Sequence, residues 1–211
     1  TLKDLKGEIL DLSETGMPDM SDFRLEYYPY LTGYASRSCP FQCSFCSDPV
    51  FWGKFRKKSP AQVARELNEN SRRYGSQVFI MSDLLMNPMA TDLAEELIKL
   101  PASVYCDTHF RVGKEVCEIE NTFLWRRGGL YRVQLGTESG SQRVLDLMGK
   151  KITVQQIKEA VSALAEAGIK TTTYWVIGHP GETEEDFQAT LDLVEELKSD
   201  IYQAEINPFW Y

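Results

Sequence analysis

The sequence predicts an α/β protein built as a curved, partial (β/α)6 barrel, with a parallel sheet and helices outside it. Six short apolar runs alternate with five segments of helical periodicity, which is the pattern of strand–helix–strand units in one sheet. The dinucleotide-binding pattern G-x-G-x-x-G is absent, because Gly136 and Gly140 stand alone after the fourth run. A partial barrel is therefore favoured over an open doubly wound sheet. In either fold, ligands bind at the carboxyl ends of the strands.

The apolar runs have the length and composition of buried strands. They cover residues 31–35, 78–81, 104–106, 131–135, 172–177 and 201–206.

Three helices have recognisable starts, since a Ser or Thr is followed three residues later by a side chain that can bond back to it. The pairs are Ser59 with Gln62, Thr153 with Gln156 and Thr183 with Asp186. Pro60 suits the first turn of the first helix, and Gly168 is placed to end the second. Two weaker helices are predicted at residues 92–100 and 115–126.

Length and composition indicate one globular domain. The chain has 211 residues, of which 43% are hydrophobic. We expect a lead-in segment over residues 1–29 and a core domain over 30–211. Because the chain begins with Thr1 and stops just after the sixth strand, we expect an excerpt of a longer protein that lacks the final helix. No apolar run is long enough to span a membrane, and no signal peptide is visible. The net charge of −8 argues against nucleic acid as the main partner.

Three of the five cysteines form a C-x3-C-x2-C motif directly after the first strand: Cys39, Cys43 and Cys46. Cys106 and Cys117 are isolated, and we expect them to be buried as small apolar residues. Clustered thiols suit a metal site in a reducing, cytoplasmic compartment better than disulfides.

The number of thiols favours an iron–sulfur cluster over zinc. Structural zinc takes four protein ligands, whereas only three cysteines converge here and neither His109 nor His179 is near in sequence. A cubic cluster held by three thiolates leaves one iron free to bind another molecule. A zinc knuckle completed from elsewhere in the chain is the alternative.

Four segments together resemble the radical S-adenosylmethionine (SAM) enzymes, and in particular the subgroup joined to a cobalamin-binding domain. The first is the cysteine loop, with its aromatic residue before the last cysteine. The others are residues 51–60 (FWGKFRKKSP), the fourth-strand segment 134–141 (QLGTESGS) and the fifth-strand segment 176–183 (VIGHPGET). The resemblance extends from about residue 30 to the end.

The resemblance implies a partial (β/α)6 barrel of the radical SAM type with a [4Fe-4S] cluster on the three cysteines. Its open iron would bind SAM, and an electron from a reductant such as flavodoxin or ferredoxin would cleave SAM to a 5′-deoxyadenosyl radical that abstracts hydrogen. The subgroup suggests methyl transfer to, or ring modification of, a small molecule, with cobalamin bound by a domain outside this chain. Alternatives are a radical methylthiotransferase and a non-catalytic metal-binding scaffold.

The resemblance also implies contacts for SAM. Phe45 would pack near the adenine, Ser82 or Asp83 would hold the methionine amino group, and Arg111 would pair with its carboxylate. Glu138 would bind the ribose. Three further cofactor contacts lie in the strand motifs: Gln134, Ile177 and Gly178.

Each assignment has a plainer alternative. Asp83 could be a turn aspartate, Glu138 a surface glutamate and Arg111 part of a solvated salt bridge. His179 is predicted to be a turn histidine, and Glu182 a charge at a helix start.

Overall fold

The computed structural model describes residues 10–210. Its main sheet is curved and has six parallel strands. The strand order is β1-β4-β5-β6-β7-β8, so each strand lies beside the next one in sequence. These strands are β1 (Leu31–Gly33), β4 (Val78–Met81), β5 (Tyr105–Arg111), β6 (Leu130–Glu138), β7 (Lys170–Ile177) and β8 (Gln203–Pro208). The short strands β2 (Ser36–Arg37) and β3 (Arg56–Lys57) pair antiparallel outside the sheet.

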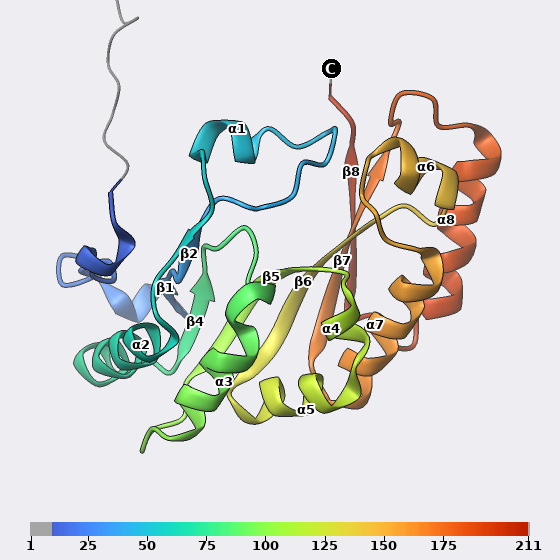
Figure 1. Cartoon of the computed structure of the whole chain (residues 1–211). Coiled ribbons are helices and arrows are strands. Elements are labelled where there is room, and N and C mark those ends of the chain that lie inside the picture. Colours follow the sequence, from blue (N-terminus) through green and yellow to red (C-terminus); the bar gives the residue numbers. More distant parts are fainter. Residues whose placement is uncertain (1–9, 211) are drawn as a thin grey trace, which may run out of the picture.

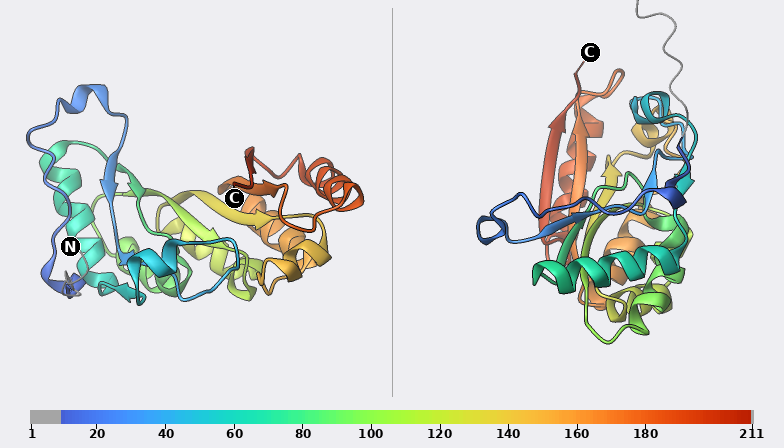
Figure 2. Two further views of the ribbon diagram at one scale, coloured as in Figure 1. Left: turned by 90° about the horizontal axis from the view of Figure 1, so that it is seen from above. Right: turned by 90° about the vertical axis from the view of Figure 1, so that its left-hand side faces the viewer.

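Helices follow the strands and cover the outer face of the sheet (Figures 1 and 2). The α-helices are α1 (Asp48–Trp52), α2 (Pro60–Tyr74), α3 (Ala90–Ile98), α4 (Lys114–Cys117), α5 (Ile119–Arg127), α6 (Gln142–Leu147), α7 (Val154–Glu166) and α8 (Glu184–Leu197). Short 3-10 turns occur at Leu12–Glu14, Leu25–Tyr27 and Asn87–Met89. Figure 1 shows the segment from β2 to α1 at the end of the sheet where β8 finishes.

The predicted helix starts are confirmed with one exception. The side chains of Thr153 and Thr183 each take part in a complete capping box at the start of α7 and α8. The hydroxyl of Ser59 accepts from the backbone N–H of Gln62 as predicted. The Gln62 side chain does not return to the cap, however, because its amide donates to the backbone carbonyl of Ser13 at 3.1 Å.

The element bounds differ from the sequence prediction where polar residues occupy regular structure. β5 continues to Arg111 and β6 to Glu138, well beyond the predicted ends at residues 106 and 135. The predicted helix over 115–126 is two helices, because Glu118 between them has an extended backbone. The two short helices α1 and α6 were not predicted.

The two faces of the sheet differ in polarity because side chains alternate along each strand. Val133 and Leu135 of β6 are fully buried in the core against the helices. Gln134 and Gly136, between and beyond them, border a cavity on the concave face. The sheet therefore has an apolar outer face for packing and a polar inner face for ligands.

The described part of the lead-in packs on the core. Leu12 is buried, the hydroxyl of Tyr34 donates to the carbonyl of Gly16 at 2.6 Å, and the Tyr74 hydroxyl accepts from the backbone of Met20 at 2.9 Å. The boundary at residue 30 stays a prediction, and residues 1–9 of the predicted lead-in lie outside the described residues. Within residues 10–210, no helix combines the length and the apolar character needed to cross a membrane.

Candidate active site

A cavity of about 400 Å³ lies on the concave face at the carboxyl ends of the strands. Its walls come from the cysteine loop, from β5 to β8 and from the segment after α6. The lining residues are Cys39, Cys43, Phe45, Cys46, Asp48, Leu84, Leu85, His109, Phe110, Arg111, Gln134, Gly136, Glu138, Lys150, Tyr174, Val176 and Asn207. The position agrees with the ligand site predicted for this fold.

All three cysteines of the motif border this cavity as free thiols. A turn in which the backbone N–H of Cys46 donates to the carbonyl of Cys43 at 3.1 Å brings two of them together. The loop is also held by the segment after α6, since the backbone N–H of Ser44 donates to the carbonyl of Met148 at 2.9 Å. Three free thiols are thus presented to one cavity.

The chemistry of these thiols fits an iron–sulfur cluster. Burial raises the pKa of Cys39, and the positive charges of Arg111 and Lys150 act in the opposite direction. Burial also raises the pKa of Cys46. Three thiols beside two cations suit a cluster, because each thiolate would bind a different iron and the cations would balance the negative charge of the thiolates. No group of three or more His, Cys, Asp or Glu side chains in the described part of the chain is gathered closely enough for a single metal ion.

Glu138 lies in the cavity wall and forms a buried ion pair that the sequence did not suggest. Its Oε1 lies 2.5 Å from Nζ of Lys150, and both residues are less than 10% exposed. Glu138 ends β6 at a bulge with a φ of 67°, a conformation that is rare for residues other than glycine. A Cβ at Gly136 would lie 2.7 Å from the Glu138 carboxylate and 2.9 Å from Nζ of Lys150. The glycine therefore leaves the space that this pair occupies.

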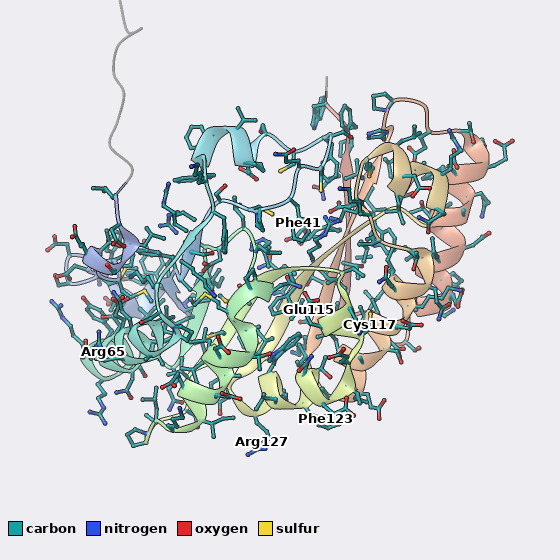
Figure 3. All side chains as sticks on the ribbon, viewed as in Figure 1. Phe41, Arg65, Glu115, Cys117, Phe123 and Arg127 are labelled. Carbon is teal, nitrogen blue, oxygen red and sulfur yellow. The ribbon has the colours of Figure 1, made fainter. Side chains whose placement is uncertain are left out.

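Arg111 is the last residue of β5, and its side chain contacts the cysteine loop. Its Nη1 donates to Sγ of Cys43 at 3.3 Å, and its guanidinium lies 4.2 Å from the ring centre of Phe41. Figure 3 labels Phe41 at this end of the sheet, far from Arg127 at the opposite end. Arg111 is 8% exposed, so a solvated surface salt bridge is the wrong description.

A chain of hydrogen bonds begins at the cavity floor, where Gln134 and Tyr174 line the cavity, and ends at Asp107 outside the lining. The hydroxyl of Tyr174 donates to Oε1 of Gln134 at 2.6 Å, and Nε2 of Gln134 donates to Asp107 at 3.0 Å. The Gln134 amide is therefore engaged at both ends, which favours a role in holding Tyr174 over direct contact with a cofactor.

His109 stacks beside Tyr174 on the same floor, with the ring centres 6.3 Å apart. Its Nδ1 is buried and has no hydrogen-bond partner within residues 10–210. Burial lowers the pKa of His109, although the Asp107 carboxylate opposes this effect. Burial therefore favours a neutral imidazole at this point of the cavity lining.

Ser82 and Asp83 do not line the cavity. The Asp83 carboxylate is 1% exposed and accepts from the backbone N–H of Ala35 at 3.0 Å and from the hydroxyl of Ser36 at 2.5 Å. The Ser82 hydroxyl donates to the carbonyl of Gly33. This geometry favours anchoring of the chain just before Cys39 over contact with the methionine amino group.

The fifth-strand residues lie at the margin of the site. Val176 lines the cavity, whereas Ile177 and Gly178 are not among its lining residues, and their contact with adenine stays a prediction. The backbone N–H of Gly178, which has a φ of 82°, donates to the Glu182 carboxylate at 2.5 Å. Glu182 therefore closes this turn and is more than a charge at a helix start.

Phe45 lines the cavity, and its ring centre lies 5.9 Å from Nζ of Lys150, whereas its packing near the adenine stays a prediction. Cys106 is buried, as predicted, and Cys117 is half-buried, where its thiol contacts the carbonyls of Gly113 and Gln156. His179 contacts the carbonyl of Pro180 and lies outside the cavity lining, as a turn histidine would.

Sequence reasoning missed Lys150 and the hydrogen bonds that join Asp107, Gln134 and Tyr174. Lys150 stands in an unremarkable Lys-Lys pair, and nothing in the sequence links it to Glu138. The floor carried a usable signal, because the polar residues Asp107, His109 and Arg111 alternate with apolar or small ones as in a strand.

Comparison with known proteins shows the family and the fold of this chain. The family model of the Radical SAM superfamily matches residues 34–194. The anaerobic magnesium-protoporphyrin IX monomethyl ester cyclase of Rubrivivax gelatinosus is 31% identical over 169 residues, which are 79% of this chain and 30% of that protein. The cytidylyl-2-hydroxyethylphosphonate methyltransferase of Streptomyces wedmorensis is 31% identical, and the match covers 82% of this chain and 36% of that protein.

A similar fold occurs in the radical SAM methyltransferase TsrM from Kitasatospora setae, solved with cobalamin and a [4Fe-4S] cluster. Its TM-score is 0.77 at 20% identity, and the match covers 87% of this chain and 35% of that one. The likeness confirms the predicted partial-barrel fold. This chain spans about a third of the length of the curated relatives described above.

Proposed function

This chain belongs to the radical SAM superfamily, and we propose that Cys39, Cys43 and Cys46 hold a [4Fe-4S] cluster whose remaining iron binds SAM. The observation that carries the proposal is the convergence of the three thiols on one cavity that also contains a buried carboxylate and two buried cations. When bound and reduced, the cluster supplies the electron that splits SAM into methionine and a 5′-deoxyadenosyl radical.

The residues of the cavity suit the binding and orientation of SAM. The Glu138 carboxylate can accept hydrogen bonds from ribose hydroxyls, and Lys150 can share its charge with the methionine carboxylate. Phe45 supplies an aromatic face for the adenine. A radical reaction also needs water excluded, and the apolar walls formed by Leu84, Leu85 and Phe110 serve that need.

We propose methyl transfer or ring modification of a small molecule as the overall reaction. The names of two relatives, a methyltransferase and a cyclase, support these two reaction types. Cobalamin would be bound by a part of the protein outside residues 1–211. The polar floor formed by His109 and Tyr174 would face the substrate, and a protein such as flavodoxin or ferredoxin would supply the electron.

Anaerobic reconstitution with iron and sulfide tests the cluster. We expect about four irons and four sulfides per chain. Under dithionite, the reconstituted protein should convert SAM to 5′-deoxyadenosine. Cys43→Ala should abolish both properties, whereas Cys117→Ala, which changes a thiol outside the cavity, should keep them. A zinc-only protein, or a cluster that survives in the Cys43→Ala variant, would refute the proposal.

Two further measurements separate the alternatives. Cobalamin retained by the full-length protein would favour methyl transfer or ring modification over methylthiotransfer. A cluster-bearing protein that never cleaves SAM would be a non-catalytic scaffold.

A further inference from the structure

Arg111 is a buried cation whose guanidinium has no carboxylate partner at ion-pair distance within residues 10–210. The other buried cation of the cavity, Lys150, is paired with Glu138 at 2.5 Å. The contacts of the Arg111 guanidinium are instead a sulfur, Sγ of Cys43 at 3.3 Å, and the ring of Phe41 at 4.2 Å. Burying a charge without a counter-charge is costly, so this position calls for an anion. The acidic group that the guanidinium contacts is the Cys43 thiol.

The backbone holds Arg111 in place. Its N–H donates to Oδ1 of Asn87 at 2.9 Å, and Nδ2 of Asn87 donates to its carbonyl at 2.9 Å. The same Nδ2 donates to the Glu115 carboxylate at 2.6 Å. The Phe41 ring covers the guanidinium from the loop side. The side chain is thus directed at the sulfur by a fixed strand end and by a packed ring, which distinguishes it from a mobile surface arginine.

We propose that Arg111 donates an N–H···S hydrogen bond to the Cys43 thiolate in the cluster-bound protein and thereby raises the reduction potential of the cluster. This inference rests on the cluster proposed above. Reduction adds one negative charge to the cluster, and a hydrogen bond and a positive charge at a ligand sulfur stabilise that form. Arg111 is then a positioning and tuning residue for the cluster, in place of the carboxylate contact that the resemblance implied. Lys150 becomes the cavity cation available to the SAM carboxylate.

The test is a redox titration of the full-length, reconstituted protein without SAM, followed by the electron paramagnetic resonance signal of the reduced cluster. Arg111→Gln should lower the ratio of reduced to oxidised cluster about tenfold at a fixed potential, which corresponds to about 59 mV for a one-electron couple. Arg111→Lys should shift the ratio less, in the same direction, because a lysine keeps the charge and loses the planar fork. The matched control is Arg127→Gln, which removes the same charge from an exposed site at the opposite end of the sheet and should leave the ratio unchanged (Figure 3).

The affinity for SAM distinguishes an Arg111 that bonds to the Cys43 sulfur from an Arg111 that binds the SAM carboxylate. Under the proposal, the Kd for SAM in Arg111→Gln stays within about threefold of the wild-type value, since the guanidinium is committed to the sulfur. An unchanged potential with a Kd raised tenfold or more would assign Arg111 to the SAM carboxylate and overturn the proposal.

Failure of the cluster proposal itself is distinguishable from failure of this inference, because the wild-type protein would then hold no cluster after reconstitution. If the glutamine variant does not fold, Arg111→Lys decides. A lowered potential supports the inference, and an unchanged potential refutes it.

Discussion

Nζ of Lys150 lies 2.5 Å from Oε1 of Glu138, and the two buried side chains meet in the cavity wall although they are twelve positions apart in the chain. The carboxylate comes from the bulged end of β6, and the ammonium comes from the segment after α6. Each side chain neutralises the other in a place where neither could be buried alone. The ion pair therefore couples the stability of the barrel rim to the shape of the ligand site.

The ion pair leads to a double-mutant prediction. Glu138→Gln should destabilise the protein by about 3–5 kcal/mol, because the Lys150 charge is left buried without a partner. Adding Lys150→Met should restore most of that stability, measured by chemical denaturation. Neither the single nor the double variant should bind SAM well, and we expect the Kd to rise at least tenfold. Normal SAM affinity in the double variant would remove both residues from the binding site.

Gly136→Ala should affect binding more than stability. The added Cβ would meet the ends of two flexible side chains, Glu138 and Lys150, which can move at little cost to the fold. We expect a loss of about 1 kcal/mol or less in the free energy of unfolding and a Kd for SAM about tenfold higher. Gly16→Ala is the control, since nothing lies within 4 Å of its Cβ. Equal SAM affinity in the two variants would contradict the packing argument.

Asp83→Asn tests whether this buried carboxylate anchors the cysteine loop. The asparagine loses one of the two acceptor oxygens that serve Ala35 and Ser36, so we expect a loss of about 1–3 kcal/mol in stability and a lower iron content after reconstitution. The exposed Asp22→Asn should change neither. If Asp83→Asn keeps its stability and its cluster but binds SAM weakly, its carboxylate contacts SAM instead.

His109 should make the protein more stable as the pH rises towards neutrality. Burial lowers the pKa of His109 below its ordinary value of 6.5, so between the two pKa values the unfolded chain binds more protons than the folded one. The stabilisation is complete above about pH 6.5 and is lost as the pH falls through the folded-state pKa. Unfolding measured from about pH 8 to about pH 5 should show this slope in the wild-type protein and lose it in His109→Gln. The control is His179→Gln, at the only other histidine in the sequence, and this variant should retain the slope.

The order of the elements and the position of the three-cysteine motif could be predicted from the sequence, because both are local patterns. Apolar runs of strand length and the caps at Thr153 and Thr183 involve residues a few positions apart. The C-x3-C-x2-C spacing carries its chemistry within eight residues. Apolar runs alone do not give the strand ends, since β5 and β6 continue through polar residues; in β5 only the alternation of these residues indicates the strand.

The contacts that shape the cavity were decided by the tertiary structure. Arg111 meets Cys43 from 68 positions away, Asp83 meets Ala35 from 48, and Gln134 joins Tyr174 to Asp107 across three strands. The sequence by itself determined which residue types lie at the carboxyl edge of the sheet, because strand alternation and motif spacing are properties of neighbouring residues. The curvature and register of the sheet decided which of those side chains meet, and a carboxylate or cation acquires its role from the partner it meets.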